Sequence, residues 1–171
     1  MKKIIMILVV AAVSVIGAAA QKFALVDMEY IMKNIPAYEM ANEQLRQLSD
    51  RWQREIETLN NEASNLYQKY MQDKIFLSEE QKAVREQQVV AKEKEATELR
   101  YKYFGPEGEL NKKRQSLLKP VQDDIYNAVK KVADERGYQL IMDRASSSDI
   151  IFASPRIDVS NEVLAKLGYS N

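Results

Sequence analysis

The feature that most constrains this chain is a long polar run with one apolar stripe. Between Ala37 and Lys119, glycine and proline occur only in the segment FGPEGEL, residues 104–110. Over the first half of the run, apolar residues recur at steps averaging about 3.6 residues, the period of an α-helix. They are Ala41, Leu45, Leu48, Trp52, Ile56, Leu59, Ala63, Leu66 and Tyr70. The run therefore predicts a long helix that buries one narrow stripe and keeps its other faces in water.

A second helix is expected to return along the first. The first helix should end near Lys74, and Ser78 with Gln81 forms a capping box that begins a new helix at Glu79. A connection this short makes antiparallel neighbours. The sequence therefore predicts a helical arm over residues 37–119, roughly 55 Å long at 1.5 Å per residue.

The pairing of the two helices can also be predicted. The returning helix offers an apolar stripe at Val84, Ala91 and Leu99, interrupted by polar residues. Hairpin geometry places Trp52 beside Tyr101, with Tyr103 and Phe104 close by. A seam this imperfect predicts a flexible arm with some accessible apolar surface.

The segment FGPEGEL admits three interpretations: a phosphate-binding loop, a domain boundary or a bend in the returning helix. The first lacks a Gly-Lys-Ser/Thr sequence, and its two glutamates would repel phosphate. The second is disfavoured because helical sequence resumes at Leu110. Pro106 removes a backbone donor, and Gly105 and Gly108 loosen the backbone, so we expect a kink near Gly105. The kink could be a hinge or static.

The first residues indicate export. Lys2 and Lys3 precede an apolar run and then small residues at 18–20, the pattern of a signal peptide over residues 1–20, cleaved before Gln21. The apolar run is short for a membrane anchor, so no stable membrane insertion is expected. Without the leader the formal net charge is −2, which gives no general attraction to nucleic acid or anionic lipid.

The two ends of the mature chain, residues 21–36 and 120–171, predict a small β-rich body. Expected strands are Phe23 to Val26, Tyr138 to Met142 and Ile150 to Ala153. An amphipathic helix should follow Pro120 and end at Gly137, and Ser160 should cap a last helix closed by Gly168. The fold class is thus α+β, with a helical hairpin inserted into the body. Pro36 and Pro120 should mark the junctions.

A body of this size is marginal as a single core, and short strands leave unpaired edges. Both problems are relieved if several copies assemble through the body. The residues expected at this interface are apolar strand residues, Phe23, Leu25, Leu140, Ile141, Ile151 and Phe152.

Several segments of the body resemble the Skp (OmpH-like) family of periplasmic chaperones. They are residues 22–27 (KFALVD), 120–133 (PVQDDIYNAVKKVA), 137–143 (GYQLIMD) and 157–167 (IDVSNEVLAKL). The arm matches the family only in its pattern. The resemblance implies a periplasmic homotrimer with helical arms around a cavity, which holds unfolded outer-membrane proteins without ATP.

The residues expected to contact such clients are aromatic and apolar residues of the arm and its tip, which suit loose contacts with varied apolar segments. They are Trp52, Tyr67, Tyr70, Met71, Ile75, Phe76, Leu77, Tyr101, Tyr103 and Phe104. Trp52 and Tyr70 also fit the seam of the hairpin. Gly105, Pro106 and Gly108 are the expected hinge.

Two other classes of protein compete with this interpretation: an enzyme and a coiled-coil adaptor. The chain has no histidine and no cysteine, which removes the usual general base, thiol nucleophile and transition-metal ligands. A polar loop is a simpler explanation of Ser146 to Ser148 than a nucleophile. Turn capping is likewise a simpler explanation of Asp143 and Asp149 than a weak calcium site. We therefore expect no enzyme, cofactor or metal. The remaining alternative is an exported coiled-coil adaptor that binds one folded partner.

Overall fold

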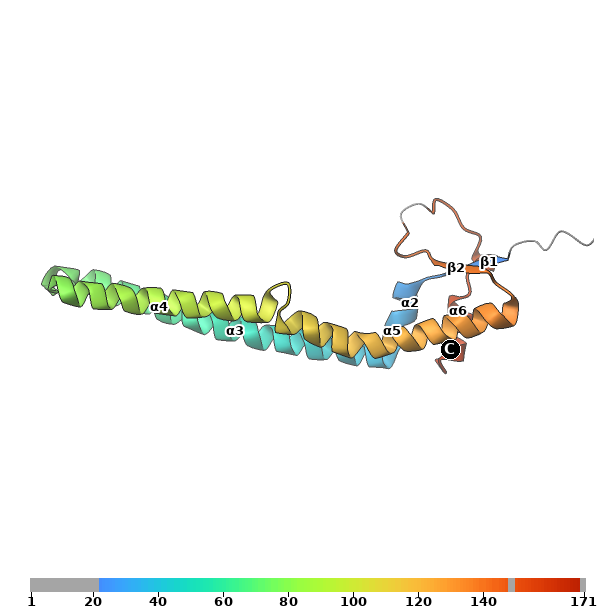
Figure 1. Ribbon diagram of the computed structural model, residues 1–171, viewed down its shortest axis with the longest axis horizontal. Helices are drawn as coiled ribbons and strands as arrows, with labels where there is room; N and C mark the ends of the chain where they lie inside the picture. Colours follow the sequence, from blue (N-terminus) through green and yellow to red (C-terminus); the bar gives the residue numbers. More distant parts are fainter. Residues whose placement is uncertain (1–21, 148–149, 170–171) are drawn as a thin grey trace, which may run out of the picture. The chain divides into compact units, whose positions relative to one another are not determined.

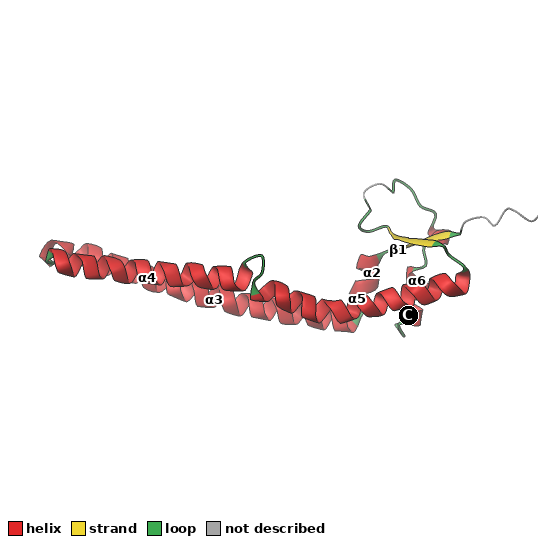
Figure 2. Ribbon diagram, in the orientation of Figure 1, coloured by secondary structure: helices red, strands yellow, loops and turns green. Residues whose placement is uncertain are grey.

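The computed structural model describes residues 22–147 and 150–169, and it divides into two compact units. The arm unit is Ile35–Asp123, and the body unit is formed by the segments on either side of it. The expected signal peptide, its cleavage site, Ser148 and Asp149 lie outside the described residues. Helices dominate the described part (Figure 2), beside a two-stranded sheet.

The arm unit contains the expected antiparallel hairpin (Figure 1). Helix α3 (Pro36–Asp73) begins with proline at its first position, where the missing N–H is not needed. A short 3-10 turn, η1 (Lys74–Phe76), connects it to α4 (Glu79–Phe104). The predicted capping box is confirmed: Gln81 N–H donates to the Ser78 hydroxyl, and Ser78 N–H donates to the Gln81 side chain.

The stripe predicted on α3 faces the interior of the arm. Ala41, Leu45, Ile56, Leu59, Ala63 and Tyr70 are buried, while Leu48, Trp52 and Leu66 are half-buried. On α4 the prediction was wrong, because Val84 and Ala91 are exposed and the buried residues are Val89 and Ala96. Leu99 does pack on the core formed by Ile56, Leu59 and Ala96.

The register of the hairpin is slightly shifted from the prediction, although Tyr103 and Phe104 do lie close to Trp52 as expected. Trp52 stacks on Tyr103, with ring centroids 4.6 Å apart, and meets Phe104 edge-on. Tyr101, the predicted neighbour, points to solvent. Polar contacts between the helices hold this register: Tyr103 hydroxyl donates to Glu55, Lys92 pairs with Glu62 at 3.0 Å, and Tyr70 hydroxyl donates to Glu86.

The returning helix is interrupted rather than kinked. Helix α4 ends at Phe104, and α5 (Glu109–Arg136) begins after a non-helical turn at residues 105–108, which we call the break segment. Pro106 cannot donate to the carbonyl four residues earlier, and its ring collides with that turn, so the interruption is complete. The break segment is the loop between α4 and α5 in Figure 2.

The helix does not break at the expected junction at Pro120, because α5 continues through it, and the arm unit ends at Asp123. A proline inside a helix loses one hydrogen bond, and the exposed position of Pro120 leaves the freed carbonyl within reach of water. Gly137 adopts a φ of 71° just after α5, as predicted for its C-terminal end.

In the body unit, β1 (Phe23–Val26) pairs in parallel with β2 (Leu140–Asp143), with Phe23 opposite Leu140. The second strand begins later than predicted because Tyr138 N–H donates to Ala133 and belongs to the end of α5. The predicted strand Ile150 to Ala153 does not form. Val159, not that segment, meets the other edge of β1, where its N–H donates to Leu25.

Three helices cover this small sheet. They are α2 (Met28–Lys33), the end of α5, and α6 (Ser160–Lys166), and their fully buried residues are Ile31, Ile125, Val132 and Val163. Ser160 does not cap α6 as predicted. Its hydroxyl accepts from Asp27 N–H, while Val159 is the N-cap residue. Gly168, with a φ of 84°, follows the end of α6 as expected.

Candidate functional site

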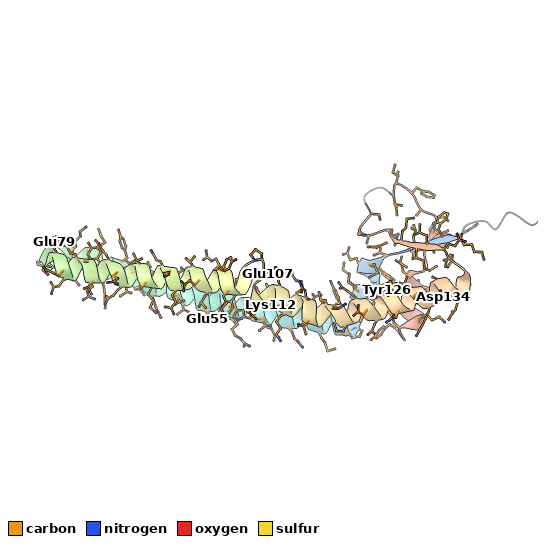
Figure 3. All side chains as sticks on the ribbon, in the orientation of Figure 1. Glu55, Glu79, Glu107, Lys112, Tyr126 and Asp134 are labelled. Carbon is orange, nitrogen blue, oxygen red and sulfur yellow. The ribbon has the colours of Figure 1, made fainter. Side chains whose placement is uncertain are left out.

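The tip of the arm carries its most exposed apolar side chains. Ile75 is 83% exposed and Phe76 81% exposed, and both belong to the turn η1; Leu77 is half-buried. Tyr67 and Met71 are about half exposed, and the four-residue steps from Tyr67 through Met71 to Ile75 place them along one side of the arm. Figure 3 shows this end, where Glu79 is labelled. Five of the predicted site residues thus form one apolar tip.

The other predicted site residues divide between the seam and the solvent. Four of them pack between the two helices and stabilise the hairpin. They are Trp52, Tyr70, Tyr103 and Phe104. Tyr101 is 71% exposed and lies apart from the tip. The structure therefore does not bring all ten predicted residues together.

The seam tyrosines remain neutral over the physiological range. The hydrogen bond to Glu86, with burial and the charge of Glu86, raises the pKa of Tyr70 to about 12. Desolvation, followed by the hydrogen bond to Glu55, raises the pKa of Tyr103. Both hydroxyls are hydrogen-bond donors to a carboxylate, so they hold the register and do not act as acids.

Two apolar residues of α4 were not expected to face solvent: Val84, which was predicted in the seam, and Val90. Val84 and Val90 lie off the seam and are more than half exposed. An open groove of about 360 Å³ also runs between the helices, near the break segment. It has an apolar floor and a polar rim, and is lined by Gln53, Ile56, Glu57, Asn60, Arg100 and Phe104.

The break segment is a compact turn rather than a loose linker. Gly105 N–H donates to Tyr101, Gly108 N–H donates to Gly105, and the Asn111 side chain donates to Pro106. A Cβ atom at Gly105 would lie 2.4 Å from the Tyr101 oxygen, and one at Gly108 would lie 2.7 Å from the Tyr103 oxygen. Both positions therefore require glycine. Glu107, labelled in Figure 3, is exposed.

The body unit has its own apolar surface. Phe23 and Leu140 are about half exposed, Phe152 is 84% exposed and Ile151 is fully exposed. Leu25 is buried and Ile141 is half-buried, so these two predicted interface residues belong in part to the core of one chain. A groove of about 360 Å³ lies here, and it is lined by Phe23, Leu25, Met142, Ile150, Ile151, Phe152, Ala153 and Ile157.

A polar network lies at the ends of the two strands. Arg144 pairs with Asp27 and with Asp158, each at 3.1 Å. Burial raises the pKa of Asp143, but hydrogen bonds from the Ser146 side chain and from the N–H groups of Met28, Ala145 and Ser146 outweigh it and lower that pKa. Through these hydrogen bonds, the carboxylate of Asp143 caps the loop that follows β2.

Other classes of site find no support in the described residues. In residues 22–147 and 150–169, no group of three histidine, cysteine or acidic residues is arranged to hold a metal ion. Within the same ranges, no helix combines the length and apolarity needed to cross a membrane. The proposed pair of Asp143 with Asp149 cannot be placed, because Asp149 lies outside these ranges.

Comparison with known proteins supplies the family. The model of the family described as Outer membrane protein (OmpH-like) matches residues 22–167. The chain belongs to the OmpH-like family. No curated protein matches it at a significant level.

A solved structure shows that the OmpH-like fold is shared. It is the crystal structure of a candidate outer membrane chaperone (OmpH-like) from Caulobacter crescentus CB15, with a TM-score of 0.69. The match covers 88% of this chain and 86% of that chain at 14% sequence identity. At this identity the likeness establishes the fold alone, so the function of this OmpH-like chain depends on its own surfaces.

Proposed function

We propose that this OmpH-like protein is a periplasmic chaperone that holds unfolded outer-membrane proteins without ATP. Its family, the candidate chaperone that shares its fold and the apolar tip of the arm support the proposal. The exposed tip is the main support for the proposed chaperone function, because its side chains serve no packing role within one chain.

The chemistry of the tip suits an unfolded client. Burying a large apolar side chain stabilises by about 1.5–3 kcal/mol, so Ile75 and Phe76 each leave a favourable contact unmade in the single chain. Met71 adds a flexible side chain that adapts to different neighbours. Such a surface binds many different apolar segments with modest affinity. The strands of an unfolded β-barrel are segments of this kind.

In the proposed assembly, three chains associate through their bodies and the arms surround the client. Phe23, Leu140, Ile151 and Phe152 are exposed in the single chain and form the proposed contact between bodies. Gly105, Pro106 and Gly108 give each arm a place to change direction. Signal-peptide cleavage before Gln21 releases the mature chain.

The test is to replace the tip residues Ile75, Phe76 and Leu77 together with serine. The variant should suppress the aggregation of a diluted, urea-unfolded outer-membrane β-barrel several-fold less well, with unchanged helicity by circular dichroism. Val90→Ser, a matched exposed position away from the tip, should retain full activity. Equal suppression by the tip variant would remove the tip from the binding surface.

A coiled-coil adaptor is the competing function, and cross-linking in the periplasm separates the two. A photoreactive residue at position 75 should capture many unfolded barrel proteins. Capture of one folded protein in a fixed ratio would favour the adaptor.

A further inference from the structure

The break segment interrupts a helix whose apolar pattern is not interrupted. On α4 the seam residues are Val89, Ala96, Leu99 and Tyr103. On α5 the apolar residues that continue the same spacing are Leu110 and Leu117, which are half-buried, and Val121, which is buried. Counted straight through the break, these positions recur at about 3.6 residues, the period of one continuous helix. The sequence therefore keeps the two stripes in phase as if the break were absent.

The length of the break explains how both arrangements can keep this phase. Four residues lie outside the helix between Phe104 and Glu109. Four helical residues rotate the chain by about 400°, which is one full turn plus only about 40°. Adding them to the helix or leaving them out changes the direction of the apolar stripe little, but it moves α5 along the arm by about one turn.

We propose that the break segment makes the arm a one-turn register switch. In the looped register, which the structure shows, residues 105–108 lie outside the helix. In the continuous register they join it, and α5 moves about one helical turn relative to α4. This inference is independent of the proposed chaperone function, because its readouts are conformational.

The residues of the break favour the looped register. Pro106 opposes the continuous helix, because it has no N–H and its ring clashes with the preceding turn. The two glycines permit the loop, since a Cβ atom at either position would lie under 3 Å from a backbone oxygen. Replacing Gly105, Pro106 and Gly108 with alanine removes the obstacle to the helix and disfavours the loop. The triple variant should therefore favour the continuous register.

The contacts of α4 identify α5 as the part that moves. Helix α4 is held to α3 by the Tyr103–Glu55, Lys92–Glu62 and Tyr70–Glu86 pairs. It is also joined to α3 by the short turn at the tip. Helix α3 carries stripe residues at each turn from Trp52 to Ala41, so an α5 shifted by one turn would again meet apolar residues of α3.

Spin labels across the break test the proposal. The chain has no cysteine, so labels can be attached at Lys94→Cys and Gln115→Cys, both exposed positions. Labelled chains are diluted with unlabelled chains so that only distances within one arm contribute. A deletion of residues 105–108 fixes a continuous helix in the short register, about 25 Å between the labelled positions. The triple variant G105A/P106A/G108A should fix the long register, about 31 Å.

The expected result is a peak near the short distance for the unmodified break, the long distance for the triple variant and both peaks for P106A. E107A, an exposed position in the same loop, should match the unmodified break. Circular dichroism confirms that each variant is folded. The emission of Trp52, the single tryptophan, should not change, because its stack on Tyr103 lies on the stationary side.

Three results would overturn the switch. The triple variant could keep the short distance, or P106A could show the short distance alone. A single broad distribution that spans both distances in P106A would indicate continuous bending at the break without two defined registers. A change in Trp52 emission in the triple variant would overturn the assignment of α5 as the moving part.

Discussion

At the scale of single residues, the arm depends on polar groups placed within an apolar seam. Tyr70 is buried on α3, and its hydroxyl donates to Glu86 on α4. A buried hydroxyl without a partner is unfavourable, so this pair is satisfied in one register of the hairpin and not in its neighbours. Lys92 on α4 adds an ion pair across the hairpin to Glu62, and its hydrogen bonds to Glu62 and to Glu95 on its own helix raise the pKa of the lysine.

Replacing Tyr70 with phenylalanine should lower the thermal midpoint of the arm by roughly 2–4 °C. The variant loses the hydrogen bond to Glu86 while keeping the ring in the seam. Melting followed by circular dichroism at pH 7 measures the effect. Tyr67→Phe, at an exposed position, is the matched control and should leave the midpoint unchanged.

The same pair makes a prediction about alkaline pH. The pKa of Tyr70 is raised from 10.0 to about 12 in the folded arm. The contribution of the protonated hydroxyl is therefore complete below pH 10 and is lost as the pH rises toward 12. The difference in midpoint between the parent and Tyr70→Phe should shrink over that window, and a constant difference would contradict the assignment.

At the scale of elements, the sequence predicted the helices better than their pairing. The stripe on α3, the capping box at Ser78 and the strand from Phe23 to Val26 follow from local patterns, and the structure confirms them. The seam of α4 could not be predicted locally, because Val84 and Ala91 make a stripe as regular as Val89 and Ala96. Contacts across the hairpin decide between the two faces.

Leucine substitutions distinguish the two faces of α4. Ala96 is 2% exposed, so Ala96→Leu should force apart α3 and α4 and destabilise the arm by about 1–3 kcal/mol. Ala91→Leu places the same side chain in solvent and should change the free energy of unfolding by less than about 0.5 kcal/mol. Urea denaturation compares the two. A larger cost at Ala91 than at Ala96 would instead favour the predicted stripe through Val84 and Ala91.

At the scale of the whole molecule, the candidate site was predicted in part. The tip residues were found because apolar side chains in a tight turn have little to pack against. The aromatic residues near Trp52 were assigned ambiguously, because seam and binding surface use the same residue types. The strand expected at Ile150 to Ala153 has no ladder in the described part of a single chain, and its exposed residues fit the proposed contact between copies.

Replacing Ile151 and Phe152 with serine should dissociate the proposed trimer while each chain remains folded. Both side chains are exposed in the single chain, so the body core does not depend on them. Sedimentation equilibrium at micromolar concentration should show a trimer for the parent and a smaller species for the variant. Val163→Ser, at a fully buried position, should instead unfold the body. A parent that sediments as a folded monomer would contradict the assembly.

The parallel pairing of β1 with β2 also sets the order in which the chain can fold. Phe23 and Leu140 are opposite one another in the sheet, so the first strand must wait for nearly the whole polypeptide to emerge before it finds its partner. The hairpin needs only neighbouring sequence, and contacts of low contact order form faster. A nascent chain would therefore carry a formed arm ahead of a body, and the proposed contact between bodies could form only after synthesis is almost complete.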